Sequence, residues 1–410
     1  MDEKILKKYA ALAVRNGVNV RPGQPLVITA AVQDAPFVRM CAEEAYSAGA
    51  SKVTVRWTDE TLTHMGYEHQ SVETLTDIPD WITERERYEQ GQGVCYLHIE
   101  SDTPGFMGDV DQEKIRQYRL AAMKKLEPYQ TYTINNIGQW SIVAVPGRGW
   151  AKKVFPDLPE DEAVEALGDA ILYASRVLAD NDPAAEWKRH DEELEERCRI
   201  LNGYQFSALH FTNSLGTDLT VGLVKDHIWA GGRSFTPEGV AFNANIPTEE
   251  CFCMPDRLRV DGKVFASMPL DLRGTLVKDF WFEFKDGKVA DHSAAEGLEA
   301  LDGMLETDEG STRLGEVALV PYESPISKQG ILYFNTLFDE NASCHLALGR
   351  CYPENIRGGE EMEPDELLAA GGNYSMNHVD FMFGTADMNV TGIGADGSQT
   401  PVFRNGNFVF

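Results

Sequence analysis

The feature that most constrains the fold is a strand–helix–strand pattern near the start of the chain. Leu26-Val27-Ile28 is a short apolar strand, and residues 52–57 alternate in polarity as a second strand does. Between them, Pro36 suits the first turn of a helix, and Gly49 stands where that helix ends. A helix with short links on both sides joins two parallel strands of one sheet. The first part of the chain is therefore predicted to be α/β.

Further segments extend this α/β region. Residues 94–99 and 141–145 are apolar runs that continue the parallel sheet. Apolar residues at helical spacing predict helices over 4–16 and 159–178, and another helix begins at Pro183. This last helix carries dense mixed charges, which indicate a solvated face and a connection between domains.

After about residue 200 the pattern changes to short strands. Hairpin turns are predicted at Asp261-Gly262, Asp286-Gly287 and Asn405-Gly406, each flanked by strand-like residues. A helix is predicted near residues 294–306. The second half is therefore expected to be α+β and rich in antiparallel strands.

The length supports two domains, because 410 residues exceed the usual size of a single hydrophobic core. We expect an α/β N-terminal domain with a mostly parallel sheet over residues 1–195. An α+β C-terminal domain with mainly antiparallel strands is expected over residues 196–410.

The charge is strongly acidic: 37 Lys and Arg stand against 65 Asp and Glu, for a net charge of −28. Such a field repels phosphate backbones, which argues against a nucleic-acid partner. Most of the acids must form a solvated shell, but some can be gathered into metal sites. Acids in a metal site should stand in apolar segments rather than in charged surface runs.

The chain begins without a basic-then-apolar signal segment, and no apolar run approaches the length that spans a bilayer. Its seven cysteines are scattered, as reduced thiols in a hydrophobic core are. We therefore expect a cytoplasmic protein with no membrane partner.

One motif is set aside because its context is wrong. Residues 392–397 fit the G-x-G-x-x-G pattern of dinucleotide sites, which needs a strand before it and a helix after it. Residues 399–403 instead read as a strand, so a β-turn is the better interpretation.

Acids in apolar surroundings indicate a metal site in the second half. Glu250 follows Thr248-Glu249, just after a strand-like segment that ends at Pro247. Glu316 lies in a strongly apolar strand, 314–320, with Val317 and Leu319 expected on the opposite side. A buried carboxylate needs a partner or a metal ion, whereas a solvated edge position would explain it without one.

Histidines join these acids in two further segments. Residues 339–345 hold Glu340 and His345 at the end of an apolar stretch. In a strand at 378–382, His378 and Asp380 point to the same side and can reach one ion. The six groups exceed what one ion ordinarily needs, and mixed carboxylate and imidazole ligation suits zinc, cobalt or manganese. No H-E-x-x-H helix motif is present.

With these segments, the chain resembles the aminopeptidase T and aminopeptidase S family of metal-dependent exopeptidases over essentially its full length. The matching stretches are residues 9–28, 229–257, 315–321, 331–352 and 378–380. The match from Asn335 to His345 is highly specific, whereas the H-x-D of 378–380 means little alone.

The resemblance implies a homodimer with two divalent ions per subunit, zinc, cobalt, manganese or magnesium, in the C-terminal domain. Two such ions activate a water and polarise a peptide carbonyl, so peptides with a free N-terminus are the implied substrates. The implied ligands, with Glu316 as the bridge, are Glu250, Glu316, Glu340, His345, His378 and Asp380.

Two catalytic residues are also implied. Tyr352 is expected to donate a hydrogen bond to the tetrahedral oxyanion, or else only covers the ligand loop beside Pro353. Glu249 is expected to act as a general base or to anchor the substrate ammonium, unless it lies in solvent.

Two alternatives remain open from the residues alone. The first is another two-metal hydrolase, an amidase or a phosphoesterase. The second is a two-domain protein that binds a small molecule without turnover.

Overall fold

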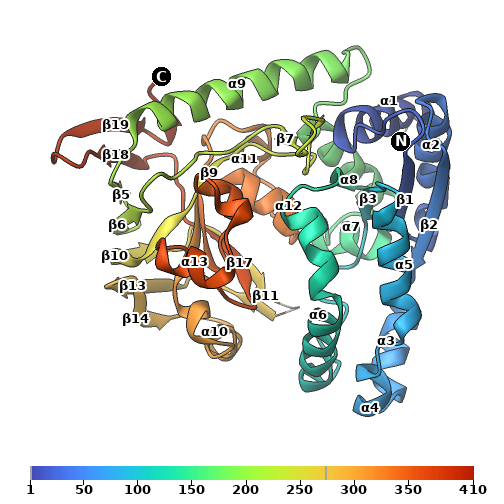
Figure 1. Ribbon diagram of the computed structural model, residues 1–410, viewed down its shortest axis with the longest axis horizontal. Coiled ribbons are helices and arrows are strands. Elements are labelled where there is room, and N and C mark those ends of the chain that lie inside the picture. The colour runs from blue at the N-terminus through green and yellow to red at the C-terminus, as the bar shows by residue number, and fades with distance from the viewer. Residues whose placement is uncertain (1, 273–274) are drawn as a thin grey trace. The chain divides into compact units, whose positions relative to one another are not determined.

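The computed structural model describes residues 2–272 and 275–410, which form two compact units (Figure 1). The first unit comprises the chain up to Arg189 together with Arg233–Pro247, and the second comprises His190–Gly232 and Thr248–Phe410. Residues 190–195 thus pack with the second unit and 233–247 with the first, so neither unit is one continuous segment. The division at 195/196 stays a prediction about where folding domains end.

A parallel sheet forms the centre of the first unit, as the strand–helix–strand pattern predicts. Its strand order is β2-β1-β3-β4, and every neighbouring pair is parallel. The four strands are β1 (Pro25–Ala31), β2 (Lys52–Thr58), β3 (Cys95–Glu100) and β4 (Trp140–Ala144). Strand β1 is central and reads as an apolar run because both of its faces are covered.

Helices follow and flank these strands. The predicted helix at 4–16 is α1 (Glu3–Leu12) continued by a π-helical turn, and Tyr9 donates from its hydroxyl to the Ala144 carbonyl at the end of β4. The predicted helix at 159–178 ends earlier, at Ala174. The other helices of this unit are α2 (Ala35–Ser47), α3 (Glu60–His69), α4 (Val72–Thr76), α5 (Asp80–Gly91), α6 (Gln112–Ile134), α7 (Arg148–Val154) and α8 (Glu160–Ala174), with the short strands β7 (Ser234–Phe235) and β8 (Ala241–Phe242).

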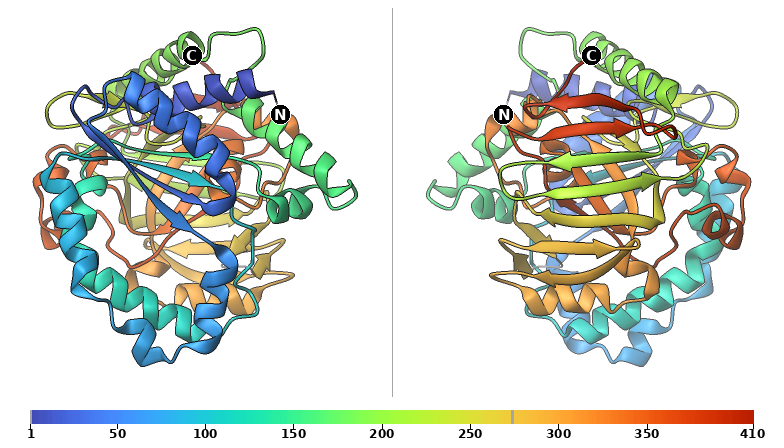
Figure 2. Two further views of the ribbon diagram at one scale, coloured as in Figure 1. Left: turned by 90° about the vertical axis from the view of Figure 1, so that its right-hand side faces the viewer. Right: turned by 90° about the vertical axis from the view of Figure 1, so that its left-hand side faces the viewer.

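An antiparallel sheet of eight strands dominates the second unit, which confirms the predicted change of fold class (Figure 2). Its order is β14-β13-β10-β6-β5-β18-β19-β20. The strands are β5 (Ala208–Thr212), β6 (Asp218–Leu223), β10 (Pro255–Phe265), β13 (Trp281–Lys285), β14 (Lys288–Ser293), β18 (Asn389–Ile393), β19 (Gln399–Arg404) and β20 (Asn407–Phe408). Helix α9 (Pro183–Tyr204) contributes buried Leu194 and Leu201 to the core of this unit.

Two of the three predicted hairpin turns are confirmed. Asp286-Gly287 joins β13 to β14, and Asn405-Gly406 joins β19 to β20. The turn predicted at Asp261-Gly262 is wrong, because β10 runs through it and pairs with β6 and β13. A Cβ at Gly262 would lie 2.2 Å from the Asp218 carbonyl oxygen, so the glycine permits a close strand approach there.

A second, four-stranded antiparallel sheet packs in the same unit. Its order is β17-β16-β15-β9, and its strands are β9 (Cys251–Cys253), β15 (Leu314–Leu319), β16 (His345–Gly349) and β17 (His378–Met382). The remaining elements are β11 (Leu270–Leu272), β12 (Thr275–Val277), α10 (Leu298–Leu305), α11 (Pro325–Gln329), α12 (Thr336–Asp339) and α13 (Pro364–Ala369). One apolar cluster contains residues from both sheets, such as Phe211, Val390, Leu346 and Phe381.

The G-x-G-x-x-G segment lies in the hairpin between β18 and β19. An antiparallel hairpin offers no helix N-terminus for a pyrophosphate, which agrees with the sequence interpretation.

Candidate metal centre

The four-stranded sheet separates an apolar face from an ionisable face. Successive side chains of a strand point to opposite sides. Val317 and Leu319 of β15 lie in the apolar core, as do their neighbours Leu346, Leu348 and Phe381. The alternate positions carry the acids and histidines, so the sequence prediction for the two sides of residues 314–320 is confirmed.

The register brings these alternate positions together. Across β15, β16 and β17, Glu316 pairs with Ala347 and Ala347 pairs with Asp380. His345 pairs with Ala318, and His378 pairs with Gly349. Small residues therefore lie between the ionisable ones, and this leaves room above the sheet for long side chains and a ligand.

A bulge in β15 directs Glu316 to this face. Leu314 pairs with Leu348 but Glu316 pairs with Ala347, so Gly315 is the extra residue. A Cβ at Gly315 would lie 2.3 Å from the Arg350 carbonyl oxygen, so only glycine fits there without displacement. An isolated glycine in a strand pattern was the available signal for this bulge.

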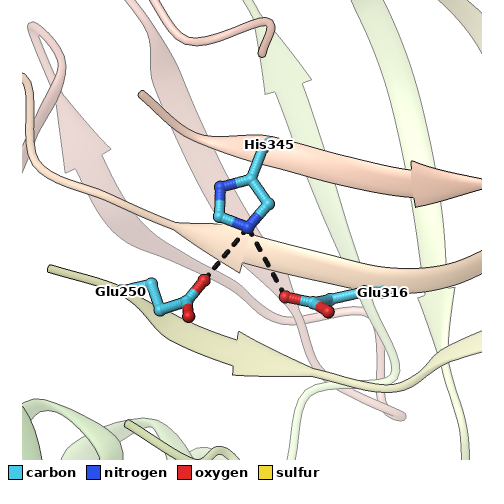
Figure 3. A group of neighbouring side chains, drawn as sticks. All are labelled: Glu250, Glu316 and His345. Atoms are coloured by element: carbon cyan, nitrogen blue, oxygen red, sulfur yellow. Dashed lines mark ion pairs between the residues drawn. The ribbon is translucent and has the colours of Figure 1, made fainter. Parts of the chain in front are cut away.

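The first group of potential ligands is Glu250, Glu316 and His345, all buried (Figure 3). Glu250 directly precedes β9, and His345 begins β16. The Nε2 atom of His345 lies 3.0 Å from Glu250 Oε2 and 3.5 Å from Glu316 Oε1. Figure 3 shows both carboxylates converging on that one nitrogen.

The second group is Glu316, His378 and Asp380. The Nε2 atom of His378 lies 3.4 Å from Glu316 Oε2 and 3.4 Å from Asp380 Oδ1. Within each group the potential ligand atoms lie within 4.8 Å of one another. Glu316 belongs to both groups and offers a different oxygen to each.

Both imidazoles are oriented by backbone carbonyls. Nδ1 of His345 lies 2.9 Å from the Glu340 carbonyl oxygen, and Nδ1 of His378 lies 2.7 Å from that of Arg350. A carbonyl only accepts, so Nδ1 carries the proton in each ring. The Nε2 lone pair of a neutral ring then faces the carboxylates, as in histidines that bind metal ions.

The electrostatics show a site built around positive charge. Burial raises the pKa of Glu316, but hydrogen bonds from the two histidines outweigh it and hold the pKa at about 2. Burial lowers the pKa of His345, but its hydrogen bonds to Glu250 and Glu316 raise it well above the ordinary value. Bound protons on the imidazoles thus supply charge that a divalent cation can supply instead.

Glu340 lies beside these two groups rather than within them. It is half-buried in the turn that follows α12, and Asn341 Nδ2 donates to its Oε1 atom at 3.3 Å. Burial and the negative charges of Asp380 and Glu250 raise the pKa of Glu340 well above its usual range. Its carboxylate therefore shares the electrostatic field of the same site.

Tyr352 borders the acids. Its ring centroid lies 4.8 Å from that of His378 and 5.9 Å from that of Phe252. The side chain is 37 % exposed, yet burial of its hydroxyl end, followed by the charges of Glu316 and Asp380, raises its pKa well above 10. The phenol therefore faces the ionisable face of the sheet while part of the ring stays accessible.

Glu249 is buried, which excludes the solvated position considered from the sequence. Its Oε2 atom lies 3.7 Å from Nε2 of His190, and its backbone N–H donates to Asn341 Oδ1 at 2.7 Å. Sequence reasoning did not single out His190 and Asn341, which contact Glu249, or Phe252, whose ring packs on that of Tyr352. Asn341 lay inside the segment 335–345, but nothing in its spacing marked it.

The donor set fits divalent metal ions. Within residues 2–272 and 275–410, no lysine or arginine forms an ion pair with Glu250, Glu316, Glu340 or Asp380. Four carboxylates in apolar surroundings would repel one another without a cation. Oxygen donors mixed with imidazole nitrogens match the preferences of zinc, cobalt and manganese.

Full-length relatives agree with this chemistry. The family model of the thermophilic metalloproteases (M29) matches residues 2–408. The chain is 43 % identical to aminopeptidase AmpS of Bacillus subtilis over 99 % of this chain and 98 % of that protein. It is 42 % identical to aminopeptidase 2 of Geobacillus stearothermophilus over 100 % of this chain and 98 % of that protein. These similarities support a metal-dependent aminopeptidase.

Solved structures give the same result for the fold. Wild-type AmpT from Thermus thermophilus superposes with a TM-score of 0.93 at 40 % identity, covering 100 % of both chains. A 2,5-dihydroxypyridine dioxygenase from Pseudomonas putida shares the fold alone, with a TM-score of 0.53 at 10 % identity over 98 % of this chain and 96 % of the other. The chain belongs to the thermophilic metalloprotease family (M29).

Proposed function

We propose that this protein is an aminopeptidase that removes the first residue of peptides with a free N-terminus, using two divalent metal ions per subunit. The observation that carries the proposal is the pair of overlapping ligand groups that share Glu316. One carboxylate with an oxygen in each group is the arrangement that a bridging ligand requires.

We assign the ligands by these groups. Glu250 and His345 would hold one ion, His378 and Asp380 would hold the other, and Glu316, which belongs to both groups, would be shared between them. Glu340 would add a further carboxylate beside these groups. Zinc, cobalt and manganese match the mixed donors best, and magnesium is the less favoured candidate because imidazole ligands suit it poorly. The ions supply an activated water and Lewis-acid polarisation of the scissile carbonyl.

The residues around the ligands handle the substrate. The Tyr352 hydroxyl donates a hydrogen bond to the carbonyl oxygen as negative charge develops there. Glu249 accepts a proton from the attacking water or anchors the substrate ammonium, and its burial supports either role because a buried carboxylate interacts strongly with a nearby charge.

We also propose that the protein is a homodimer and works in the cytoplasm. Peptide substrates are supported separately, because the relatives from Bacillus subtilis and Geobacillus stearothermophilus are both named as aminopeptidases. Among the described residues, no helix combines the length and the apolar character needed to cross a bilayer. Gel filtration with light scattering tests the dimer.

Metal removal and restoration test the proposal. We expect dialysis against a chelator to abolish hydrolysis of leucine p-nitroanilide, and added zinc, cobalt or manganese to restore it. Elemental analysis of the active form should find two ions per subunit. Restored activity with a single ion would contradict the bridging arrangement.

A substrate panel separates the alternatives. N-acetyl-leucine p-nitroanilide and p-nitrophenyl phosphate should not be hydrolysed, because the proposed enzyme needs a free amino group and a peptide-like carbonyl. Cleavage of the blocked amide would indicate an amidase, and cleavage of the phosphate ester a phosphoesterase. No turnover of any substrate would favour a binding protein.

A further inference from the structure

The side chain of Asn341 links two segments that carry acids of the metal centre. It is fully buried, in the short turn Glu340–Ala342. Its Oδ1 atom accepts from the backbone N–H of Glu249 at 2.7 Å. Its Nδ2 atom donates to the Leu337 carbonyl at 2.9 Å and to Glu340 Oε1 at 3.3 Å.

These partners fix which end of the amide faces which neighbour. The N–H of Glu249 requires an acceptor, and the Leu337 carbonyl requires a donor. Only one orientation of the amide satisfies both. The second hydrogen of Nδ2 must then point to the Glu340 carboxylate.

This contact has a consequence for ligation by Glu340. The amide hydrogen takes one lone pair of Oε1, so Oε2 is the better donor for an ion. The amide also connects this carboxylate to the backbone next to Glu250, an acid of the first ligand group. Groups that hydrogen-bond a metal ligand fix its orientation, and their loss typically costs about 10- to 100-fold in metal affinity.

We propose that Asn341 is a positioning residue of the metal centre, which presents Glu340 through one oxygen and holds it in register with the Glu249–Glu250 segment. This rests on the proposed function, because it takes Glu340 to be a ligand. Asn341 would act through Glu340, without direct contact to substrate or to a metal ion.

The test compares stepwise Zn²⁺ affinity, measured by competition with a chromophoric chelator, in full-length variants. Asn341→Asp keeps the size and the acceptor for the Glu249 N–H but replaces the donor with a second carboxylate beside Glu340. Of the two stepwise Zn²⁺ affinities, we expect the weaker one to fall about 10- to 100-fold in this variant. Thermal unfolding of the metal-free protein serves as the measure of folding.

Asn202→Asp is the matched control. Asn202 lies in the same unit, its Oδ1 accepts from the Trp229 N–H at 2.8 Å, and its Nδ2 donates to the Trp229 carbonyl at 3.0 Å. The chemical change and the backbone contacts are the same in kind, but none of these contacts is to a proposed ligand. We expect its Zn²⁺ affinity to stay within twofold of the wild type.

Glu340→Gln separates the two proposals. If Glu340→Gln lowers Zn²⁺ affinity but folded Asn341→Asp does not, the positioning role is wrong and the ligand set stands. If neither variant changes the affinity, both the positioning role of Asn341 and the assignment of Glu340 as a ligand are wrong. Should Asn341→Asp fail to fold, Asn341→Ser decides, because serine is too short to reach Glu340. Equal losses in Asn202→Asp and the Asn341 variant would also overturn the inference.

Discussion

Two buried acids, one in each unit, show how differently the same chemical group is held. Asp34 follows β1 in the parallel-sheet unit and accepts a hydrogen bond from the Ser101 hydroxyl. Burial raises its pKa to about 6, and the hydroxyl only partly offsets this. Glu316 is also buried, but two imidazoles hold its pKa at about 2.

The difference teaches what prepares a carboxylate for metal binding. A hydroxyl partner leaves a buried acid near neutrality, because a neutral dipole compensates little of the lost hydration. Imidazole partners keep the acid ionised, and their protons can be exchanged for a cation. The segment after β1 in the parallel sheet and the sheet β17-β16-β15-β9 both bury acids, but among the described residues it is Glu316 in the second sheet that lies within groups of potential metal ligands.

The largest effect is expected for Glu316→Gln, which removes the charge at nearly constant volume. Both ligand groups lose their shared oxygen donor, so we expect activity below about one thousandth of the wild type and at most one bound ion. Elemental analysis and p-nitroanilide hydrolysis are the measurements. An active variant that still binds two ions would show that the charge of Glu316, like that of Asp34, is not needed for metal binding or activity.

Tyr352→Phe tests the part of the same site that faces substrate. Loss of one hydrogen-bond donor to a developing oxyanion should lower kcat about 100-fold. Metal content and KM should change little, because the ring still packs on His378 and Phe252. An unchanged kcat would mean that Tyr352 only covers the ligand loop.

The smallest effect is expected for Asp34→Asn, and it should be a gain in stability. The folded state holds the Asp34 proton more tightly than the unfolded state, whose pKa is near 3.8. Stability from this group is thus fully present below about pH 4 and is lost as the pH rises to about 6. At pH 7 the variant should be more stable by about 1–2 kcal/mol after allowance for solvent screening, with full activity.

Denaturant unfolding between pH 5 and 8 checks this prediction. The stability difference between variant and wild type should grow from pH 5 to about 6.5 and then level off. A constant difference over this range would mean that Asp34 does not change protonation on folding.

Much of the fold could be predicted from the sequence, because the spacing at which apolar residues recur differs between helices and strands. The parallel order of the first sheet followed from the short links around the helix at 35–47. The failure at Asp261-Gly262 has a physical reason: the same dipeptide that makes a tight turn also lets two strands approach closely.

The candidate site was predicted as a set of residues rather than as a geometry. Six residues stood out because they lie in apolar or turn contexts, and the structure brings all of them except Glu340 into two groups: Glu250, Glu316, Glu340, His345, His378 and Asp380. The sequence could not indicate to which side the bulge at Gly315 turns Glu316, nor the hydrogen bond from the Glu249 N–H to Asn341. Both depend on strands and turns that are distant in the chain.

The sequence by itself determined the family, the two classes of sheet and which side chains are available as ligands, since these follow from local pattern and residue chemistry. Only the tertiary structure decided that Glu316 offers one oxygen to each ligand group and that Glu340 lies beside them. The physical reason is register: pairing between strands β15, β16 and β17 sets which side chains share a face, and pairing is a long-range property of the chain.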